Sequence, residues 1–329
     1  MAIEQVIRLA ERFFTDPDHH IFAQVPPSWV PYVELTRLNQ PVGALMPILL
    51  YGVGLTFAAC VSQPLIPMSE FFVLAWHSDI WLFIMRHALC TFNDAIDYEY
   101  DRKVRRCRLR PVARGAITPE RALQFSAAQL ILGAYALSNL PRESHGLGVI
   151  TTLIMMIYPF AKRFTHFPQL IMGSSFTVSI FMACAAVGVD ASFESEQFPS
   201  ALFLGVACML IVAIADTIYA YQDIRDDAEA GIKSMTLVLG DRPKTWLWTL
   251  TAAVEGLLLM AGHQSNFSPI YYLVSCGGSF VVLSAMIALV DLRVAADCRW
   301  WFKRGGTGSV FAIMLGLYIE YFIRLCLFA

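Results

Sequence analysis

The chain has 329 residues, of which 57% are hydrophobic and 15% charged, and its mean hydropathy is +0.56. Soluble domains carry about 25% charged residues, so too little charge is present to cover a water-exposed surface, and the same composition excludes disorder. The formal net charge of −2 gives no electrostatic support for a nucleic-acid partner. The composition therefore predicts an integral membrane protein with many spans.

The N-terminal segment, residues 1–40, is expected to lie on a membrane face or on the protein as an amphipathic, interfacial segment. Its first 20 residues lack the pattern of a signal peptide, and they carry four acidic residues beside Arg8 and Arg12. A mitochondrial transit peptide is rich in arginine and poor in acidic residues, so this segment is not expected to be one. A single domain is expected to follow, with residues 41–329 forming a bundle of membrane helices.

Nine apolar stretches predict membrane-spanning helices, because a spanning helix needs about 20 mostly apolar residues. Four of them are long and uncharged, and the other five are shorter or interrupted. In chain order they are Val42–Val61, Ile80–Phe92, Ala122–Leu140, Leu147–Ala161, Leu170–Val189, Ala201–Ala215, Thr245–Gly262, Ile270–Val290 and Gly308–Ile323.

The distribution of basic residues supports nine spans. With nine crossings, the N-terminal segment and every second loop fall on one side, and these segments carry 20 of the 24 lysines and arginines. The opposite loop Asp190–Gln197 is acidic. Because basic loops face the cytosol, we expect the N-terminus and the inner ends of the second and sixth spans on the cytosolic-type side. In a eukaryote, the endoplasmic reticulum or another endomembrane is expected.

Two acidic clusters lie at the inner ends of the second and sixth spans. Asn93, Asp97 and Asp101 are spaced by four residues and would share one helix face. Asp223 and Asp227 repeat this spacing in the second cluster. Carboxylates stacked in this way repel one another at a membrane boundary, unless both clusters are simply solvated helix ends. Mg²⁺ prefers oxygen ligands and completes its shell with water and substrate phosphate, so two facing clusters could hold two Mg²⁺ ions around one diphosphate.

Basic residues accompany each acidic cluster and are suited to phosphate oxygens, although anchoring to lipid headgroups explains part of this charge equally well. Arg86 is different, because it lies inside the second span, seven residues before Asn93 and on the same helix face. An arginine inside a membrane is a functional candidate, and a buried pair with a carboxylate is the alternative. The basic residues that accompany the clusters are Arg106, Arg110, Lys162 and Lys233.

Five motifs surround these residues. The first cluster matches NDxxDxxxD, and Val104–Pro111 matches the VxRxxxRP extension that follows it. Tyr158–Gln169 matches YPxxKRxTxxPQ, Asp216–Ser234 matches DxxYAxQDxxDDxxxGxKS, and Arg37–Gly43 matches RLxxPxG. Together, over residues 32–241, they resemble the UbiA superfamily of intramembrane prenyltransferases.

The resemblance implies an all-α bundle of nine transmembrane helices around a central cavity. It also implies Mg²⁺-dependent transfer of an isoprenoid chain from a prenyl diphosphate to an acceptor, often a phenolic ring. By position, the implied metal shell is Asn93, Asp97, Asp101, Asp223 and Asp227. The implied catalytic carboxylates are Asp94, Asp97, Asp101, Asp223 and Asp227, with Asp226 in support. The implied diphosphate-binding residues are Arg106, Arg110, Lys162 and Lys233, and the implied substrate-binding residues are Arg86, Asn93, Tyr158 and Tyr219.

The residues also give a physical account of such a reaction. An allylic diphosphate ionises when metal ions and cationic side chains neutralise the leaving group, and an intramembrane cavity keeps the carbocation from water. Aromatic rings can stabilise the cation. The candidates are Phe92, Tyr158, Tyr219 and Tyr221.

Three departures from the pattern common in quinone-pathway members concern the acceptor: Tyr221 replaces a histidine, Asn39-Gln40 replaces an acidic–basic pair, and Cys107 replaces a threonine. The chain is more similar to fungal meroterpenoid prenyltransferases, which join farnesyl to polyketide phenols. The alternatives are 4-hydroxybenzoate polyprenyltransferase, an intramembrane terpene cyclase that uses the donor alone, and a transporter or cation channel.

Overall fold

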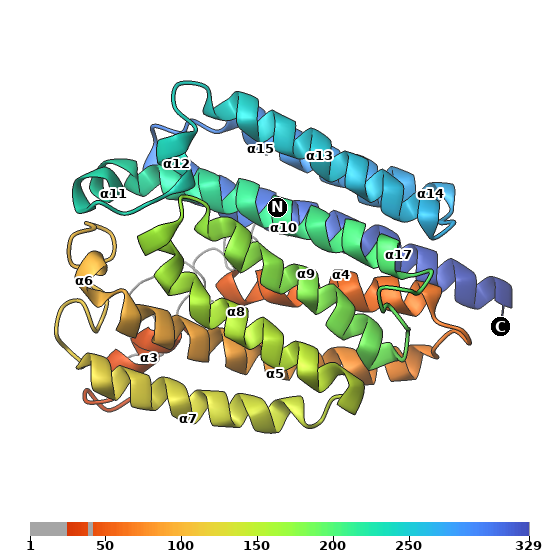
Figure 1. Ribbon diagram of the computed structural model, residues 1–329, viewed down its shortest axis with the longest axis horizontal. Coiled ribbons are helices and arrows are strands. Elements are labelled where there is room, and N and C mark those ends of the chain that lie inside the picture. The colour runs from red at the N-terminus through yellow and green to blue at the C-terminus, as the bar shows by residue number, and fades with distance from the viewer. Residues whose placement is uncertain (1–24, 39–41, 329) are drawn as a thin grey trace, which may run out of the picture.

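The computed structural model describes residues 25–38 and 42–328, and within these ranges it contains helices and no β-strand (Figure 1). The predicted interfacial segment lies largely outside the described residues, apart from the short helix α3 (Val30–Thr36). The long helices are α4 (Val42–Val61), α5 (Met68–Ile96), α7 (Pro119–Leu137), α8 (His145–Phe164), α9 (Pro168–Val187), α10 (Phe198–Ala220), α13 (Pro243–Gln264), α15 (Gly277–Leu289) and α17 (Thr307–Phe328).

Short helical segments extend or connect the long ones. They are α6 (Tyr98–Asp101), η1 (Arg142–Ser144), η2 (Tyr221–Asp223), α11 (Ile224–Ala230), α12 (Met235–Val238), α14 (Pro269–Tyr271), α16 (Ala295–Trp301) and the π-helical turns η3 (Tyr272–Cys276) and η4 (Phe302–Gly306).

A helix overlaps each of the nine stretches predicted to span the membrane. Within the described ranges, seven helical segments are long and apolar enough to cross a bilayer, which confirms a multi-pass, all-helical protein. The remaining two, α5 and α7, have sufficient length but are less apolar. Nine crossings therefore remain a prediction. The predicted second span was too short, since α5 begins at Met68 and includes the charged residues Glu70 and Asp79.

The central helices approach closely where small residues face one another. A Cβ at Gly54 of α4 would lie 3.0 Å from Ile180 Cα of α9. Helices α9 and α10 also lie in close contact. The hydroxyl of Thr177 on α9 donates a hydrogen bond to the carbonyl of Gly205 on α10 at 2.9 Å. Small residues at such positions allow membrane helices to pack by close backbone contact. In Figure 1 these helices form the middle of the bundle, with α13 and α15 on one side and α5 and α7 on the other.

The segments that carry the acidic motifs gather at one end of the bundle. Figure 1 shows α6, α11 and α12 together there, whereas the C-terminus lies at the opposite end. Near this end, α8 contains Pro159, which cannot donate a hydrogen bond to the carbonyl of Met155. Met155 lines the cavity described below, so the interruption of the α8 hydrogen-bond ladder coincides with the wall of the cavity.

Candidate active site

A cavity of about 410 Å³ lies inside the bundle below the acidic motifs. Its walls come from α4, α5, α8, α9 and α10, and from η4 and the start of α17. Charged side chains gather at one end, and the remainder of the wall is mainly apolar with some polar side chains, such as Thr151, Ser175 and Ser179. The apolar lining includes Met46, Pro47, Trp81, Leu82, Met85, Leu89, Met155, Met172 and Phe176.

The first acidic motif spans the end of α5 and the short helix α6, and helical backbone hydrogen bonds continue between them. Helix α5 ends at Ile96, and Asp97 adopts φ −90° and ψ 3°. The backbone N–H of Asp97 nevertheless donates to Asn93 O at 2.9 Å, and that of Asp101 donates to Asp97 O at 2.8 Å. The four-residue stacking expected from the sequence is therefore present. Asn93 and Asp101 line the cavity, whereas Asp97 is buried beside it.

The second acidic motif lies where α10 gives way to η2 and α11. Asp223 ends η2 and Asp227 lies in the first turn of α11, and both line the cavity. Gly231, at φ 70°, then turns the chain back, a conformation that glycine adopts without strain. This turn brings Lys233 to the cavity lining, and its backbone N–H donates to Lys162 O at 3.2 Å.

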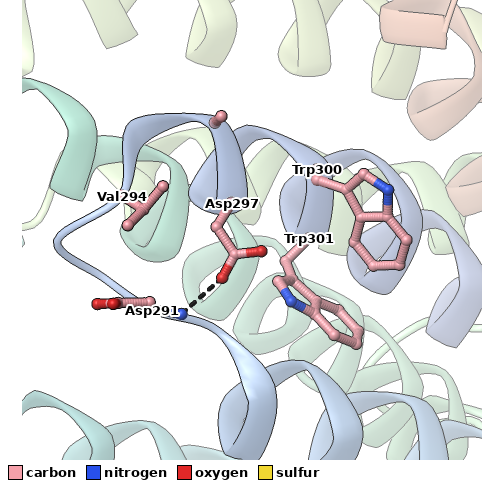
Figure 2. A pocket seen from close by; sticks show the side chains of 6 residues that line it. Asp291, Val294, Asp297, Trp300 and Trp301 are labelled. Carbon is pink, nitrogen blue, oxygen red and sulfur yellow. Dashed lines mark hydrogen bonds between the residues drawn. The ribbon is translucent and has the colours of Figure 1, made fainter.

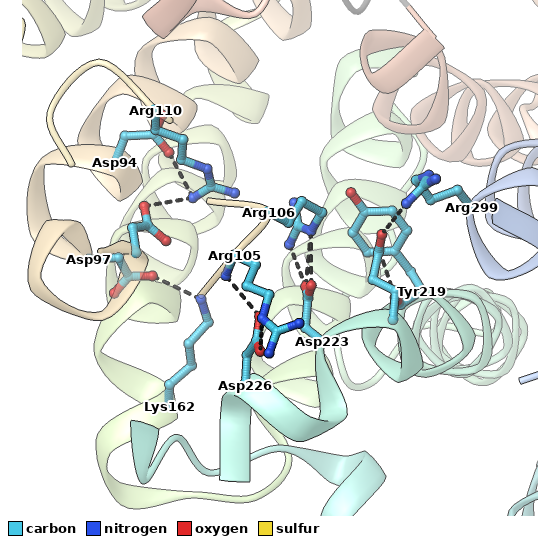
Figure 3. A network of polar contacts seen from close by, with 12 residues as sticks. Asp94, Asp97, Arg105, Arg106, Arg110, Lys162, Tyr219, Asp223, Asp226 and Arg299 are labelled. Carbon is cyan, nitrogen blue, oxygen red and sulfur yellow. Dashed lines mark hydrogen bonds and ion pairs between the residues drawn. The ribbon is translucent and has the colours of Figure 1, made fainter. Parts of the chain in front are cut away.

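Ion pairs connect the two motifs to three of the four basic residues predicted to bind diphosphate (Figure 3). Arg106 donates two hydrogen bonds to Asp223 Oδ2, from Nη2 at 2.7 Å and from Nε at 3.0 Å. Arg110 Nη1 lies 2.8 Å from Asp101 Oδ2, and Lys162 Nζ lies 2.9 Å from Asp97 Oδ2. Basic and acidic residues from separate segments therefore meet at one end of the cavity.

Asp94 has a different environment from the other carboxylates of its motif. Its side chain is 2% exposed and is absent from the cavity lining. Its Oδ1 atom accepts hydrogen bonds from Arg37 at 2.6 Å and from Arg110 at 3.1 Å. The geometry makes Asp94 a clamp between α3 and the loop after α6, in contrast to its expected place among the catalytic carboxylates. The sequence motif contained Arg37, but its spacing from Asp94 gave no sign of this contact.

Asp226 also supports the site from outside the cavity. It accepts a hydrogen bond from the backbone N–H of Arg105 at 2.8 Å (Figure 3). This contact ties the loop after the first motif to the second motif.

The electrostatic environment keeps the arginines charged. Burial lowers the pKa of Arg110, but the negative charges of Asp94 and Asp101 outweigh burial and raise that pKa well above its usual value. Burial raises the pKa of Asp101, and the Arg110 charge opposes this increase. Guanidinium groups at this end are therefore available to bind an anion in their charged form.

The carboxylates of the two motifs are chemically suited to bind a divalent metal ion, but their positions in the described ranges do not form a ready-made ligand cluster. The described ranges contain no group of three or more His, Cys, Asp or Glu side chains placed to hold a metal ion. However, Asp97 Oδ1 is buried and has no hydrogen-bond partner. A buried carboxylate oxygen without a partner is costly, and Mg²⁺ binds oxygen ligands of this kind.

The predicted substrate-binding residues lie in the cavity wall. Arg86 donates to Cys90 Sγ at 3.2 Å and has no ion pair with any described residue, and a Cβ at Gly43 would overlap its guanidinium group. Tyr158 also lines the wall. The ring of Tyr219 lies 4.5 Å from the ring of Phe302, between centroids. Asn93, Arg86, Tyr158 and Tyr219 thus all line the cavity, whereas the other aromatic candidates, Phe92 and Tyr221, do not.

Several cavity residues had no assigned role in the sequence analysis. Asp216 and Gln169 line the wall, although both lie in recognised motifs. Phe302, Lys303 and Thr307 reach the cavity from the C-terminal part of the chain. No motif marked that region, so only the three-dimensional structure brings these three residues to the site.

A second depression lies in the loop before α16 (Figure 2). It is shallow and is lined by Val294, Trp300 and Trp301 together with two aspartates. The carboxylate of Asp297 accepts a hydrogen bond from the backbone N–H of Asp291 at 2.6 Å, as the dashed line marks. This contact closes the loop locally, and none of the motif residues lies there.

The fold and the site define a multi-pass, all-helical membrane protein with an internal cavity that has one charged end. The profile of the UbiA prenyltransferase family matches residues 44–314. The chain belongs to this family and is a prenyltransferase.

Curated relatives and solved structures agree with this assignment. The chain is 36% identical to prenyltransferase ascA of Acremonium egyptiacum (85% of this chain, 83% of the relative) and 30% identical to DMOA farnesyltransferase nvfB of Aspergillus novofumigatus (92% and 95%). It is 32% identical to the mitochondrial 4-hydroxybenzoate polyprenyltransferase of Saccharomyces cerevisiae (92% and 79%).

Two archaeal structures share the fold. One is the apo structure of a UbiA homolog from Aeropyrum pernix, with a TM-score of 0.65 and 21% identity over 86% of this chain and 98% of that one. The other is a UbiA homolog from Archaeoglobus fulgidus bound to GPP and Mg²⁺, with a TM-score of 0.63 and 17% identity over 87% and 99%.

Proposed function

We propose that this protein transfers a farnesyl group from farnesyl diphosphate to a ring carbon of a phenolic acid, with Mg²⁺ as cofactor. The observation that carries the proposal is the division of the cavity into a charged end and an apolar interior. The relative named as a farnesyltransferase, 30% identical over 92% of this chain, supports the donor. The fungal relatives support a polyketide-derived phenolic acid of meroterpenoid biosynthesis as the acceptor.

The charged end would hold the diphosphate. Arg106, Arg110, Lys162 and Lys233 line it and would donate to the phosphate oxygens. Asn93, Asp97, Asp101, Asp223 and Asp227 would hold two Mg²⁺ ions, which neutralise the leaving group when bound. The unpartnered Oδ1 atom of Asp97 supports this assignment. Structures of a UbiA homolog from A. fulgidus, described as bound to GPP and Mg²⁺ and to DMAPP and Mg²⁺, support the same ion by analogy.

The apolar interior suits a chain of farnesyl length. Twelve residues of α5 separate Asn93 from Trp81 at the far end, or roughly 18 Å at about 1.5 Å per residue. If C1 lies about one helix turn, roughly 5 Å, inside the charged end, about 13 Å remain. The main chain of an extended farnesyl group also spans roughly 13 Å, at an advance of about 1.2 Å per bond as in an extended polypeptide.

Arg86 would bind the carboxylate of the acceptor. Its guanidinium lies in the cavity wall without a carboxylate partner in the described ranges. A cation held in this way within a membrane is suited to an anionic substrate group. Tyr158 and Tyr219 would flank the allylic cation, because aromatic faces attract cations.

The same scaffold would place the site at the cytosolic-type face. We propose nine membrane crossings, with α5 and α7 spanning as well as the seven more apolar segments. The N-terminus and both acidic motifs would then face the cytosol, in the endoplasmic reticulum or another endomembrane. The excess of basic residues in these loops supports this orientation.

A product assay tests the donor, the acceptor and the metal together. Detergent-solubilised protein is incubated with farnesyl diphosphate and Mg²⁺, with and without orsellinic acid or 4-hydroxybenzoate, and the products are identified by mass spectrometry. A farnesylated orsellinic-type acid and its loss with EDTA are the expected results. Prenylated 4-hydroxybenzoate alone would favour quinone biosynthesis, and a cyclic terpene formed without acceptor would favour a cyclase. No diphosphate release with any allylic donor would refute the proposal.

A further inference from the structure

The cavity contains a carboxylate that belongs to neither the proposed diphosphate site nor an ion pair. Asp216, on α10, lines the cavity. It makes no ion pair within 4.0 Å with any residue in ranges 25–38 and 42–328. By contrast, Asp101 lies 2.8 Å from Arg110, and Asp223 lies 2.7 Å from Arg106. Asp216 therefore faces the cavity without a directly bound cation.

Asp216 lies deeper than the diphosphate end. It precedes Asp223 by seven residues on α10 and its extension, or roughly 10 Å of helix. Arg86 precedes Asn93 by the same seven residues on α5, again roughly 10 Å. Both helices run toward the acidic end of the bundle (Figure 1). Arg86 and Asp216 thus lie at a similar depth, on cavity walls formed by different helices.

The groups around Asp216 are polar and incompletely satisfied. Gln169, whose side chain is 2% exposed, lines the same cavity as Asp216. The Gln169 side-chain oxygen is buried without a hydrogen-bond partner. Tyr158 lines this cavity as well. Buried polar groups are normally paired, so this set is suited to a polar part of a substrate at the depth of Arg86.

We propose that Asp216 accepts the ring proton of the phenolic acceptor. This inference rests on the proposed function and assigns its proton-transfer step. The ring carbon forms a bond to C1 of the farnesyl group, and the C1–O bond breaks with its electron pair leaving on the diphosphate. The proton on that ring carbon then passes to a carboxylate oxygen of Asp216, which restores aromaticity, and is later released to water.

Geometry favours Asp216 over the carboxylates of the metal motifs. A general base must reach the proton that it removes, and the ring lies on the apolar side of C1, away from the diphosphate. Asp101 and Asp223 lie at the diphosphate end and are bound by arginines. Asp216 lies between that end and the apolar interior, so an acceptor held by Arg86 would present its ring within reach of this carboxylate.

Asp216→Asn tests the role, because it keeps the size of the side chain and removes its basicity. Glu255→Gln on α13 is the matched control, since it also changes a carboxylate to an amide within a membrane helix and does not line the cavity. Diphosphate release and prenylated phenol are measured in parallel, with ordinary acceptor and with acceptor deuterated at the reacting ring carbon. Asp216→Glu, which retains a displaced carboxylate, serves as a second variant if Asp216→Asn does not fold.

Asp216→Asn is expected to keep diphosphate release, with water capturing the cation as farnesol, while prenylated phenol falls about 10²- to 10⁴-fold. The remaining transfer should show a primary deuterium isotope effect, which is absent from the wild type and from Glu255→Gln. Asp216→Glu should give intermediate transfer with a measurable isotope effect.

Three results would overturn the inference. Wild-type transfer by Asp216→Asn would exclude a proton acceptor. An equal fall in diphosphate release and transfer would instead assign Asp216 to donor ionisation, and a fall in transfer without an isotope effect would make it a positioning residue. A wild type that releases diphosphate but prenylates no phenol would refute the proposed function itself, whatever the variant does.

Discussion

Asp94→Asn should destabilise the fold, because Asp94 is a buried anion shared by two arginines. Its carboxylate is 2% exposed, and it accepts hydrogen bonds from Arg37 at 2.6 Å and Arg110 at 3.1 Å. The arginine side chains are 24% and 19% exposed, so solvent screens these pairs only partly. Removing one partner of a buried pair costs about 3–5 kcal/mol. Asparagine keeps an acceptor oxygen, so we expect a loss of about 2–4 kcal/mol.

A thiol-reactive dye would measure this loss as a lower unfolding midpoint, since six of the eight free cysteines are buried until the chain unfolds. At about 2–4 °C per kcal/mol, the midpoint should fall by roughly 4–16 °C. Glu194→Gln is the matched control, because Glu194 is exposed in the loop before α10, and such surface changes usually stay within about 0.5 kcal/mol. Equal midpoints for Asp94→Asn and the control would refute the clamp.

Three further variants separate binding, chemistry and specificity. Asp223→Asn should lower turnover at least about 100-fold in the fraction of protein that remains folded, and full activity with saturating Mg²⁺ would contradict its place in the metal shell. Arg86→Gln should raise KM for the acceptor about 10- to 100-fold, because this factor corresponds to the free energy of one hydrogen bond to a charged group. KM for farnesyl diphosphate should stay constant. Equal increases in both constants, from initial-rate kinetics, would remove Arg86 from acceptor binding. Trp81→Leu should shift donor preference in competition assays from farnesyl toward geranylgeranyl diphosphate, because Trp81 lines the far end of the cavity; an unchanged preference would exclude it as the limit on chain length.

Local features of the fold were predictable because they follow from short-range patterns. Apolar length located a helix at each of the nine stretches. The four-residue spacing of the first motif predicted its stacking, and backbone hydrogen bonds from Asp97 to Asn93 and from Asp101 to Asp97 confirm it. The start of α5 was missed because its early turns contain Glu70 and Asp79. Those charges end an apolar stretch without ending a helix.

Partners that are distant in sequence were not predictable, because spacing carries no information about them. Arg106 and Asp223 are 117 residues apart, and Arg37 and Asp94 are 57 apart. The sequence placed these residues at the same end of the bundle but could not assign pairs among several acids and bases. The consequence is largest for Asp94, since its motif is the same whether the side chain faces the cavity or two arginines.

The pairing explains how two acidic clusters can lie at a membrane boundary before substrate binds. Three acids of the motifs are ion-paired with three bases at this end, so much of the charge there is compensated before substrate binds. A diphosphate with Mg²⁺ would let each charge exchange one partner for another, the bases turning to phosphate and the acids to metal. Binding would then replace ion pairs instead of desolvating isolated charges. The pairs are Asp97 with Lys162, Asp101 with Arg110 and Asp223 with Arg106.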